Sequence, residues 1–273
     1  MSVRNILYAA VLLVFTAGAG CRVSKQSVTK AGTPSYSLDT RGPVWGAVWQ
    51  QRAAEYKALC FQAYNTARLQ LDRLLTQPHD KPLAVVTDID ETVLDNSPYT
   101  LHRALLDSGY SEAAWLAWTA RSACDTVPGA LSFLQFAAAR KVQVFYISNR
   151  LEAERTATLQ NLQRWNFPDA DNDHLLLKQT TSGKEERRQT VAKQYDILLL
   201  MGDNLSDFSS IFDKQTTSTR GQLVTDNAAV FGNRFIVLPN VMYGDWEGAL
   251  FDYRYGLQPA QKDSIIEAQL KTY

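Results

Sequence analysis

Four short runs of apolar residues recur along the chain and limit the folds that it can adopt. They are residues 83–88 (LAVVTD), 142–148 (VQVFYIS), 196–202 (DILLLMG) and 234–239 (RFIVLP). Runs this short and this continuously apolar are typical of strands that are buried on both faces of a parallel sheet. Helical patterns, such as 152–165 and 184–194, separate most of them, and residues 174–178 are a further candidate strand. This alternation predicts an α/β fold with a Rossmann-like parallel sheet core.

Two further segments surround the predicted core. Between 45 and 77, apolar residues recur at intervals of three and four, which predicts an amphipathic helix that ends at Pro78. The connection from residue 88 to residue 142 is far longer than a usual crossover. We therefore expect residues from about 98 to 130 to form a smaller helical cap domain.

The amino terminus has the pattern of an export signal. Residues 1–20 contain an early arginine, an apolar stretch and small residues that lead to Cys21. Cys21 resembles the lipidated cysteine of bacterial lipoproteins, and Arg22 after it favours sorting to the outer membrane of a Gram-negative host. Gly18 stands where such signals usually carry leucine, so an ordinary signal peptide with an incidental cysteine is the alternative. The polar segment that follows, to residue 40, is predicted to be a tether (21–40 with the lipidated cysteine).

The charge of the chain limits the kinds of partner that are expected. The chain has 28 basic and 28 acidic residues, and no basic stripe interleaved with aromatic residues stands out. A nucleic-acid polymer is therefore not an expected partner, and a small molecule is.

The state of the two later cysteines is left open by the sequence. Cys60 and Cys124 either pair in an oxidising compartment or are two small buried apolar side chains, and the sequence does not decide between these.

Polar residues collect at the carboxyl ends of the predicted strands, where ligands bind in open α/β sheets. Asp88 ends the first strand, and alternation along an extended segment turns Asp90 to the same side. Close carboxylates repel one another unless a cation lies between them, and an all-oxygen set of ligands suits Mg²⁺. The residues expected at this edge are Asp88, Asp90, Thr92, Ser148, Asn149, Lys184, Asp203 and Asp207.

These residue types suit phosphoryl transfer. Asp88 is the expected nucleophile, giving an aspartyl-phosphate, and Asp90 the expected general acid and base. Ser148, Asn149, Lys184 and Thr92 are the expected phosphate-binding residues. Asp88, Asp90 and Asp203 are the expected metal ligands. Asp207 is expected to hold a water of the metal or Lys184.

The motifs DIDET (88–92), ISNR (147–150), SGKEERR (182–188) and GDNLSD (202–207) resemble, in order and spacing, the four motifs of the haloacid dehalogenase (HAD) superfamily of phosphohydrolases. More narrowly, the segments 49–72, 88–99 and 239–250 are similar to the class C acid phosphatases of the lipoprotein e type, which are bacterial surface lipoproteins. The resemblance covers nearly all of the mature chain, so residues 41–273 are expected to form one phosphatase domain that includes the cap.

The resemblance implies an exported, Mg²⁺-dependent phosphoric monoester hydrolase, an acid phosphatase or 5′-nucleotidase. It acts on nucleoside 5′-monophosphates, including nicotinamide mononucleotide, and faces the periplasm or the cell surface. Tyr243 is the expected residue that stacks on the base, with Trp246, Trp118 and Trp115 behind it. The expected partners are this small substrate and, through Cys21, the membrane; a homodimer is left open.

Other functions, and purely structural roles for some residues, are alternatives to this interpretation. A sugar-phosphate phosphatase or a phosphotransferase of the same superfamily would use the same acids, and a haem-binding surface lipoprotein would use the exposed aromatic residues. Arg150 either contacts substrate or has a structural role. Residues 185–188 are expected to form a solvated helix face, and His102 is expected to be an ordinary cap residue.

Overall fold

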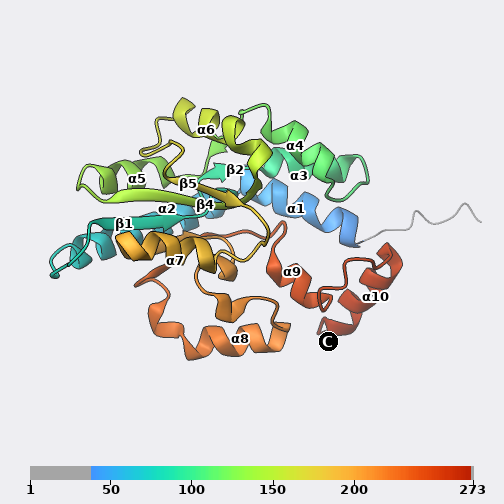
Figure 1. Cartoon of the computed structure of the whole chain (residues 1–273). Helices are drawn as coiled ribbons and strands as arrows, with labels where there is room; N and C mark the ends of the chain where they lie inside the picture. The colour runs from blue at the N-terminus through green and yellow to red at the C-terminus, as the bar shows by residue number, and fades with distance from the viewer. Residues whose placement is uncertain (1–37, 272–273) are drawn as a thin grey trace, which may run out of the picture. The chain divides into compact units, whose positions relative to one another are not determined.

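A computed structural model describes residues 38–271, so the export signal, Cys21 and most of the tether lie outside the described residues. The core is a five-stranded sheet in the order β5-β4-β1-β6-β7, with every neighbouring pair parallel (Figure 1). Its strands are β1 (Leu83–Thr87), β4 (Gln143–Leu151), β5 (Leu175–Lys178), β6 (Asp196–Gly202) and β7 (Phe235–Val237). The predicted α/β class with a parallel sheet is confirmed.

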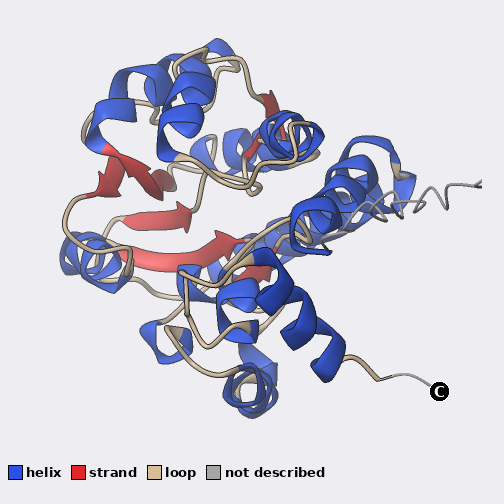
Figure 2. Ribbon diagram, turned by 90° about the vertical axis from the view of Figure 1, so that its right-hand side faces the viewer, coloured by secondary structure: helices blue, strands red, loops and turns tan. Residues whose placement is uncertain are grey.

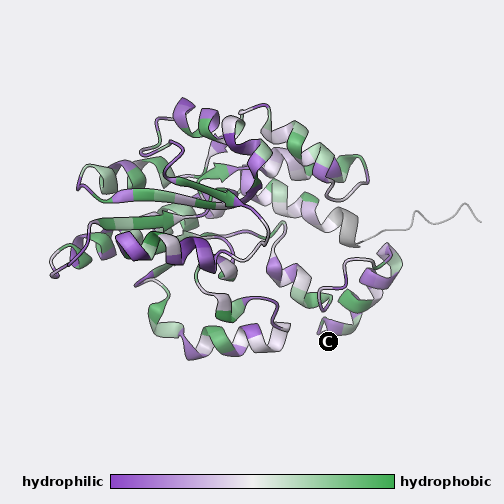
Figure 3. Cartoon of the chain, viewed as in Figure 1, coloured by the Kyte–Doolittle hydropathy of each residue, from purple (hydrophilic) through white to green (hydrophobic). Residues whose placement is uncertain are grey.

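Helices cover both faces of the sheet, because successive side chains of each strand point to opposite sides. Val85, Val144 and Leu199 pack into one apolar cluster with residues of α2 (Ala54–Leu74), α5 (Ala130–Ala138) and α6 (Arg155–Arg164). Ala84 and Val86 pack on the other face against Val191 of α7 (Glu185–Gln194). Figure 2 shows the strands of the sheet lying between helices. Figure 3 shows that these strands consist largely of hydrophobic residues.

The long connection after β1 forms a small segment of its own, which we call the cap segment. It consists of β2 (Leu94–Asp95), α3 (Ser97–Leu105), α4 (Glu112–Thr119) and β3 (Asp125–Thr126). β2 and β3 pair antiparallel and so close the segment where it leaves the sheet and returns to it. α4 lies within the range of about 98–130 expected for a cap domain, and α3 begins one residue before that range. That the segment is a separate domain stays a prediction.

The amino-terminal helical region differs from the single helix expected over 45–77. It is two helices, α1 (Leu38–Arg52) and α2, divided at Ala53, whose backbone is extended. α1 packs against the cap segment, since Gln51 Nε2 donates to Ser97 Oγ at 3.1 Å and Gln50 Nε2 to Asp95 Oδ1 at 2.6 Å. Buried residues of α2 instead face the sheet. Because of the break at Ala53, α1 packs on the cap segment while α2 packs on the sheet. α1 begins at Leu38, inside the segment that was predicted to be a tether.

The carboxy-terminal third adds helices α8 (Thr217–Asp226), α9 (Asp245–Leu250) and α10 (Pro259–Gln269). Short 3-10 turns lie at Glu152–Glu154, Leu205–Asp207, Ser210–Phe212 and Ala228–Val230. Among the described residues, no helix combines the length and apolar character needed to cross a membrane. Cys60 and Cys124 are both buried free thiols.

Candidate active site

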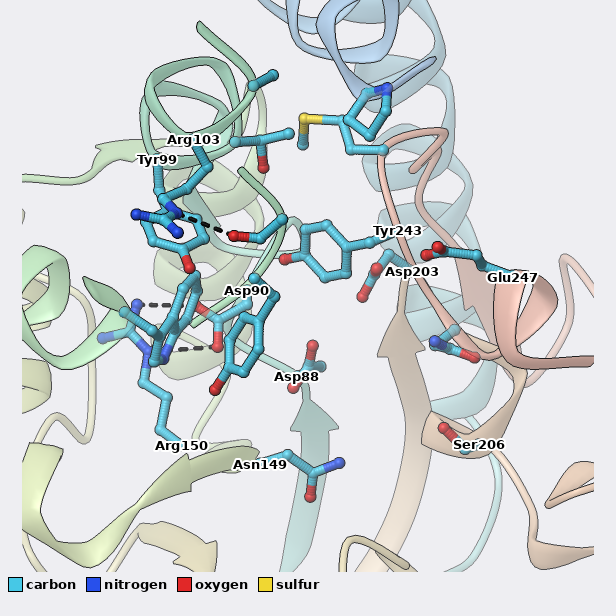
Figure 4. Close-up of a pocket in the computed structure, with 18 of the residues that line it drawn as sticks. Asp88, Asp90, Tyr99, Arg103, Asn149, Arg150, Asp203, Ser206, Tyr243 and Glu247 are labelled. Atoms are coloured by element: carbon cyan, nitrogen blue, oxygen red, sulfur yellow. Dashed lines mark hydrogen bonds and ion pairs between the residues drawn. The ribbon is translucent and has the colours of Figure 1, made fainter. Parts of the chain in front are cut away.

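Three carboxylates meet where β1 and β6 end. Asp88 follows β1, Asp203 follows β6, and the backbone N–H of Asp88 donates to the carbonyl oxygen of Met201 at 2.9 Å, which ties the two strand ends together. Asp207 comes from the turn after β6. One oxygen of each of these three acids lies within 4.8 Å of the others. The structure therefore brings Asp88, Asp203 and Asp207 together, as the strand-end argument expected. Figure 4 shows Asp88 and Asp203 side by side at the ends of their strands.

Lys184 completes this acid cluster from the start of α7. Its side chain is buried, and Nζ donates to Asp88 and, at 2.6 Å, to Asp207 Oδ1. Asp207 is held in turn because its Oδ2 accepts the backbone N–H of Asn204 at 2.9 Å. A Cβ at Gly202 would lie 2.3 Å from Asp207 Oδ2, so only glycine leaves room for this carboxylate. Lys184 thus neutralises part of the charge and bridges the nucleophile candidate to Asp207.

Asp203 is fixed by two side-chain donors. Thr92 Oγ1 donates to its Oδ1 at 3.3 Å, and Asn240 Nδ2 donates to its Oδ2 at 2.7 Å. Thr92 was expected to bind phosphate, and in this structure its hydroxyl orients an acid of the cluster instead. Asn240 was not expected at all. It follows β7, and applying the strand-end rule to that strand as well would have found it.

Replacing Asn240 with Ala is expected to weaken divalent-cation binding by about 10- to 100-fold, because residues that orient metal ligands typically have effects of that size. The change removes the donor to Asp203 and leaves the acid cluster itself in place. Titration of the metal-free protein with Mg²⁺ by calorimetry measures the effect. Asn233→Ala is the matched control, since within residues 38–271 that exposed side-chain amide bonds only the carbonyl of Ala229 in its own turn. Equal affinities in the two variants would contradict the role given to Asn240.

The carboxylate of Asp90 bonds Arg150 of β4 and lies outside the acid cluster (Figure 4). Arg150 Nη2 donates to its Oδ1 at 2.8 Å, Asn96 Nδ2 donates to the same oxygen at 2.8 Å, and Ser148 Oγ lies 3.4 Å from its Oδ2. Its side chain is therefore not among the three acids that the structure groups as possible ligands, although it was expected with them. Ser148 is buried and contacts Asp90, while its own hydroxyl also accepts the N–H of Arg150 at 3.1 Å.

The charged run at 185–188 is not a solvated face throughout, so that expectation was wrong. Arg188 is buried, and its Nη1 donates to the carbonyl oxygens of Ser206 at 2.8 Å and Asp207 at 2.9 Å. Arg187 Nη1 donates to the Ser148 carbonyl at 2.6 Å. Arg187 thus contacts β4, and Arg188 contacts the turn after β6. Helical spacing alone does not show this, because these partners are distant in the sequence.

A cavity of about 480 Å³ opens above the acid cluster. The acid-cluster residues and Lys184 line it together with Asp90, and the exposed side chain of Asn149 lines it as well. The cap segment contributes Tyr99 and Trp115, whose rings meet edge to face with centroids 5.0 Å apart. The cavity thus combines a charged inner end with an aromatic wall.

The predicted stacking residues have different positions relative to this cavity. Tyr243 lines it, and its hydroxyl donates to the buried carboxylate of Glu91. Trp115 also lines it, whereas Trp246 and Trp118 are not among the lining residues. Trp246 is half-exposed, and Trp118 packs against the core while its Nε1 donates to Asn96 Oδ1 at 2.9 Å. His102 is exposed and lies outside the cavity. Tyr99 was missed, although it ends the DIDETVLDNSPY segment.

Residues 15–246 match the family model for HAD superfamily, subfamily IIIB (acid phosphatase). The chain belongs to this family. Subfamily IIIB is a family of phosphoric monoester hydrolases, so the enzyme class and the superfamily expected from the motifs are both confirmed.

Solved structures place the chain more narrowly within subfamily IIIB. It is similar to the class C acid phosphatase from Bacillus anthracis, with 42% identity, a TM-score of 0.83, and coverage of 86% of this chain and 99% of that one. A second structure of that phosphatase, with tungstate bound, matches at the same identity and TM-score and is covered to 98%. These likenesses support the resemblance to class C acid phosphatases.

A curated relative from a plant agrees with this assignment over a shorter stretch. Acid phosphatase 1 of Solanum lycopersicum is 28% identical over 131 residues, which make up 45% of this chain and 50% of that protein. The chain spans about half the length of this relative.

The acid cluster fits the divalent cation that subfamily IIIB enzymes, as HAD phosphatases, use. Burial, together with repulsion from Asp207 and Asp90, raises the pKa of Asp88 to about 7 despite the opposing effect of Lys184. Burial, and then the charges of Asp207 and Asp88, raise the pKa of Asp203 well above its ordinary value. One lysine therefore does not balance the buried acids. Hard carboxylate oxygens that still need positive charge are suitable ligands for a cation such as Mg²⁺.

The stability of the metal-free protein is expected to fall as pH rises from about 4 to about 7, because folded and unfolded chains bind different numbers of protons there. The pKa of Asp88 in the folded chain is about 7, against an ordinary value of 3.8, so the folded state holds the proton that the unfolded state has lost. A bound cation removes this penalty. Melting curves with chelator and with excess Mg²⁺ should therefore differ more near pH 7.5 than near pH 5, and a cation effect equal at both would contradict the prediction.

Proposed function

We propose that this protein is an exported, Mg²⁺-dependent acid phosphatase that hydrolyses nucleoside 5′-monophosphates, nicotinamide mononucleotide included, through a phosphoryl group carried by Asp88. The observation that carries the proposal is the position of Asp88. Its carboxylate lies at the inner end of a cavity of about 480 Å³, bonded to Lys184 and within ligand distance of Asp203 and Asp207. A nucleophile, a cation site and room for a substrate are thus adjacent.

Asp88 and Asp90 act in different steps of the proposed reaction. Asp88 attacks phosphorus as the bond to the alcohol oxygen breaks, and Asp90 protonates that oxygen. Asp90 then takes a proton from the water that hydrolyses the aspartyl-phosphate. When bound, the divalent cation neutralises charge on the phosphoryl oxygens. Lys184 shares this task, and Asn149 offers its NH₂ group because Arg187 Nη2 already donates to its Oδ1 at 2.8 Å.

The cavity also supports a substrate with a flat ring. Its volume is in the range typical of small-molecule sites, and Tyr99, Trp115 and Tyr243 line it. A base or a nicotinamide ring stacks well on aromatic side chains, because every such ring presents a π-face. The class C relative from B. anthracis has been solved with tungstate bound, and tungstate is a tetrahedral oxyanion like phosphate. Binding of such an anion by that relative supports a phosphate ester as the substrate of this chain.

Attachment to the outer membrane through Cys21 is part of the proposal and rests on the sequence. Cys21→Ser is expected to move the protein from the membrane fraction to the soluble fraction, because a lipid chain is what anchors it. Immunoblots of fractionated cells measure this. The same distribution for wild type and variant would remove lipidation from the proposal.

A panel of substrates tests the activity. Phosphate release is measured with nicotinamide mononucleotide, other nucleoside 5′-monophosphates and sugar phosphates, each with Mg²⁺ and with chelator. The proposal expects faster release from the nucleotides and loss of release with chelator. Faster turnover of sugar phosphates would favour a sugar-phosphate phosphatase, and transfer to an added alcohol would favour a phosphotransferase. A saturable spectral change with haem, without phosphatase activity, would favour the haem-binding alternative.

A further inference from the structure

Arg150 is a buried cation that the proposed mechanism does not use. Its side chain is 1% exposed, and it is the last residue of the ISNR motif on β4. Its guanidinium grips the carboxylate of Asp90 through two nitrogens, Nε and Nη2. A planar guanidinium that bonds a carboxylate in this two-pronged way fixes the plane of the carboxylate as well as its position.

The two oxygens of Asp90 are held unequally. Oδ1 accepts Arg150 Nη2 at 2.8 Å, Asn96 Nδ2 at 2.8 Å and Arg150 Nε at 3.1 Å. Among the residues that the structure describes, the contacts of Oδ2 are longer, with Arg150 Nε at 3.2 Å and Ser148 Oγ at 3.4 Å. Since Oδ1 has three short bonds, its capacity as an acceptor is largely used. Oδ2 is the oxygen that is left to exchange a proton.

Arg150 is itself held at both ends. Its Nη1 donates to Thr158 Oγ1 of α6 at 3.1 Å, and its backbone N–H donates to Ser148 Oγ at 3.1 Å. Thr158 and Ser148 are both fully buried. The contact therefore connects Asp90 to a helix that packs on the sheet, and the loop after β1 alone does not determine where Asp90 points. A rigid second layer of this kind is what holds a reacting group in a productive geometry.

We infer that Arg150 is a positioning residue for proton transfer. With Asn96, it anchors Oδ1 of Asp90 so that Oδ2 faces the alcohol oxygen of the substrate. This inference rests on the proposed function, in which Asp90 is the general acid. As the bond from Asp88 to phosphorus forms and the bond from phosphorus to the alcohol oxygen breaks, the proton on Oδ2 passes to that oxygen. Oδ2 later takes back a proton from the attacking water, so the cycle is balanced.

The leaving group makes this role measurable. An aryl phosphate such as p-nitrophenyl phosphate releases a stable phenolate and needs little protonation, whereas a nucleoside 5′-monophosphate releases an alkoxide that needs a proton. kcat/KM reports on steps up to formation of the aspartyl-phosphate, so later hydrolysis does not mask the effect. Arg150→Gln is expected to lower kcat/KM about 100-fold for the nucleotide and less than about fivefold for the aryl ester. Arg150→Lys keeps the charge without the two-pronged contact and should fall between.

Thr158→Val tests the inference without removing the arginine, in case Arg150→Gln does not fold. It removes the hydroxyl that accepts a hydrogen bond from Arg150 Nη1. It is expected to change the ratio of the two kcat/KM values in the same direction. Arg155→Gln is the matched control, because that arginine bonds Glu152 and the Leu175 carbonyl away from the cavity. Its ratio should equal that of the wild type.

Equal losses for both esters in the Arg150 variants, or an unchanged ratio in Thr158→Val, would overturn the inference, since a phosphate contact or a purely structural role affects both esters alike. Asp90→Asn provides the second check. Once Asp90 is changed, adding Arg150→Gln should alter the ratio no further. Failure of the proposed function looks different, because the wild-type enzyme would then fail to hydrolyse the nucleotide, whether or not it cleaves the aryl ester.

Discussion

Asp88→Asn is expected to reduce phosphate release by at least about 1,000-fold, the scale of loss seen when a catalytic nucleophile is removed. The amide has nearly the shape of the carboxylate and still fits beside Lys184, but it does not attack phosphorus. Stability should not fall with activity. Because burial and neighbouring acids raise the pKa of Asp88 to about 7, its charge costs free energy of folding in the metal-free protein at neutral pH. The variant should therefore melt no lower than the wild type in chelator.

Phosphate release from nicotinamide mononucleotide and thermal melting test the two halves of this prediction on the same samples. Asp173→Asn is the matched control, because Asp173 is exposed and remote from the cavity lining. That control should keep wild-type activity and stability. Substantial residual activity in Asp88→Asn would remove Asp88 as nucleophile, and a large drop in melting temperature would show that its charge stabilises the fold.

The sheet and the acid cluster could be predicted from sequence because both depend on local pattern. Continuous apolar runs marked the strands, and β1 ends within one residue of the predicted boundary. Once the strands are parallel, their carboxyl ends share one edge, so Asp88, Asp203, Asp207 and Lys184 follow. The residue types at this edge suggested their roles in phosphoryl transfer, and the family motifs supported those roles.

Features that depend on contacts between distant segments could not be predicted in this way. The break between α1 and α2 interrupts a good helical pattern, and only the surfaces that each helix meets explain it. The direction of Asp90 depends on Arg150, 60 positions away along the chain. Arg188 lies in a run that is charged at every position, and its burial becomes clear only when the loop at Ser206 is placed beside it. Alternation along a strand gives the side on which a residue lies, and it does not give its partner.

Asp203→Ala is expected to have the second large effect. The change removes a ligand whose Oδ1 and Oδ2 are both oriented by other side chains, Thr92 and Asn240. If the cation contributes several kcal/mol to stabilising the transition state, its loss lowers the rate by about 100- to 1,000-fold. Asp88, Asp207 and Lys184 remain, so some cation binding and some activity should return at high Mg²⁺. Asn240→Ala weakens the same ligand indirectly and should need less Mg²⁺ for recovery.

Activity and melting temperature, each measured with and without Mg²⁺, distinguish loss of the cation from loss of the fold. Activity is measured against Mg²⁺ concentration for wild type, Asn240→Ala and Asp203→Ala, and the half-saturating concentration should rise in that order. Melting temperature in chelator should not fall in Asp203→Ala, because burial raises the pKa of Asp203 and its charge is unfavourable without a cation. Adding Mg²⁺ should then raise the melting temperature of the wild type much more than that of the variant. A half-saturating concentration equal in all three proteins would mean that Asp203 does not bind the cation, and the acid cluster where β1 and β6 end would need another explanation.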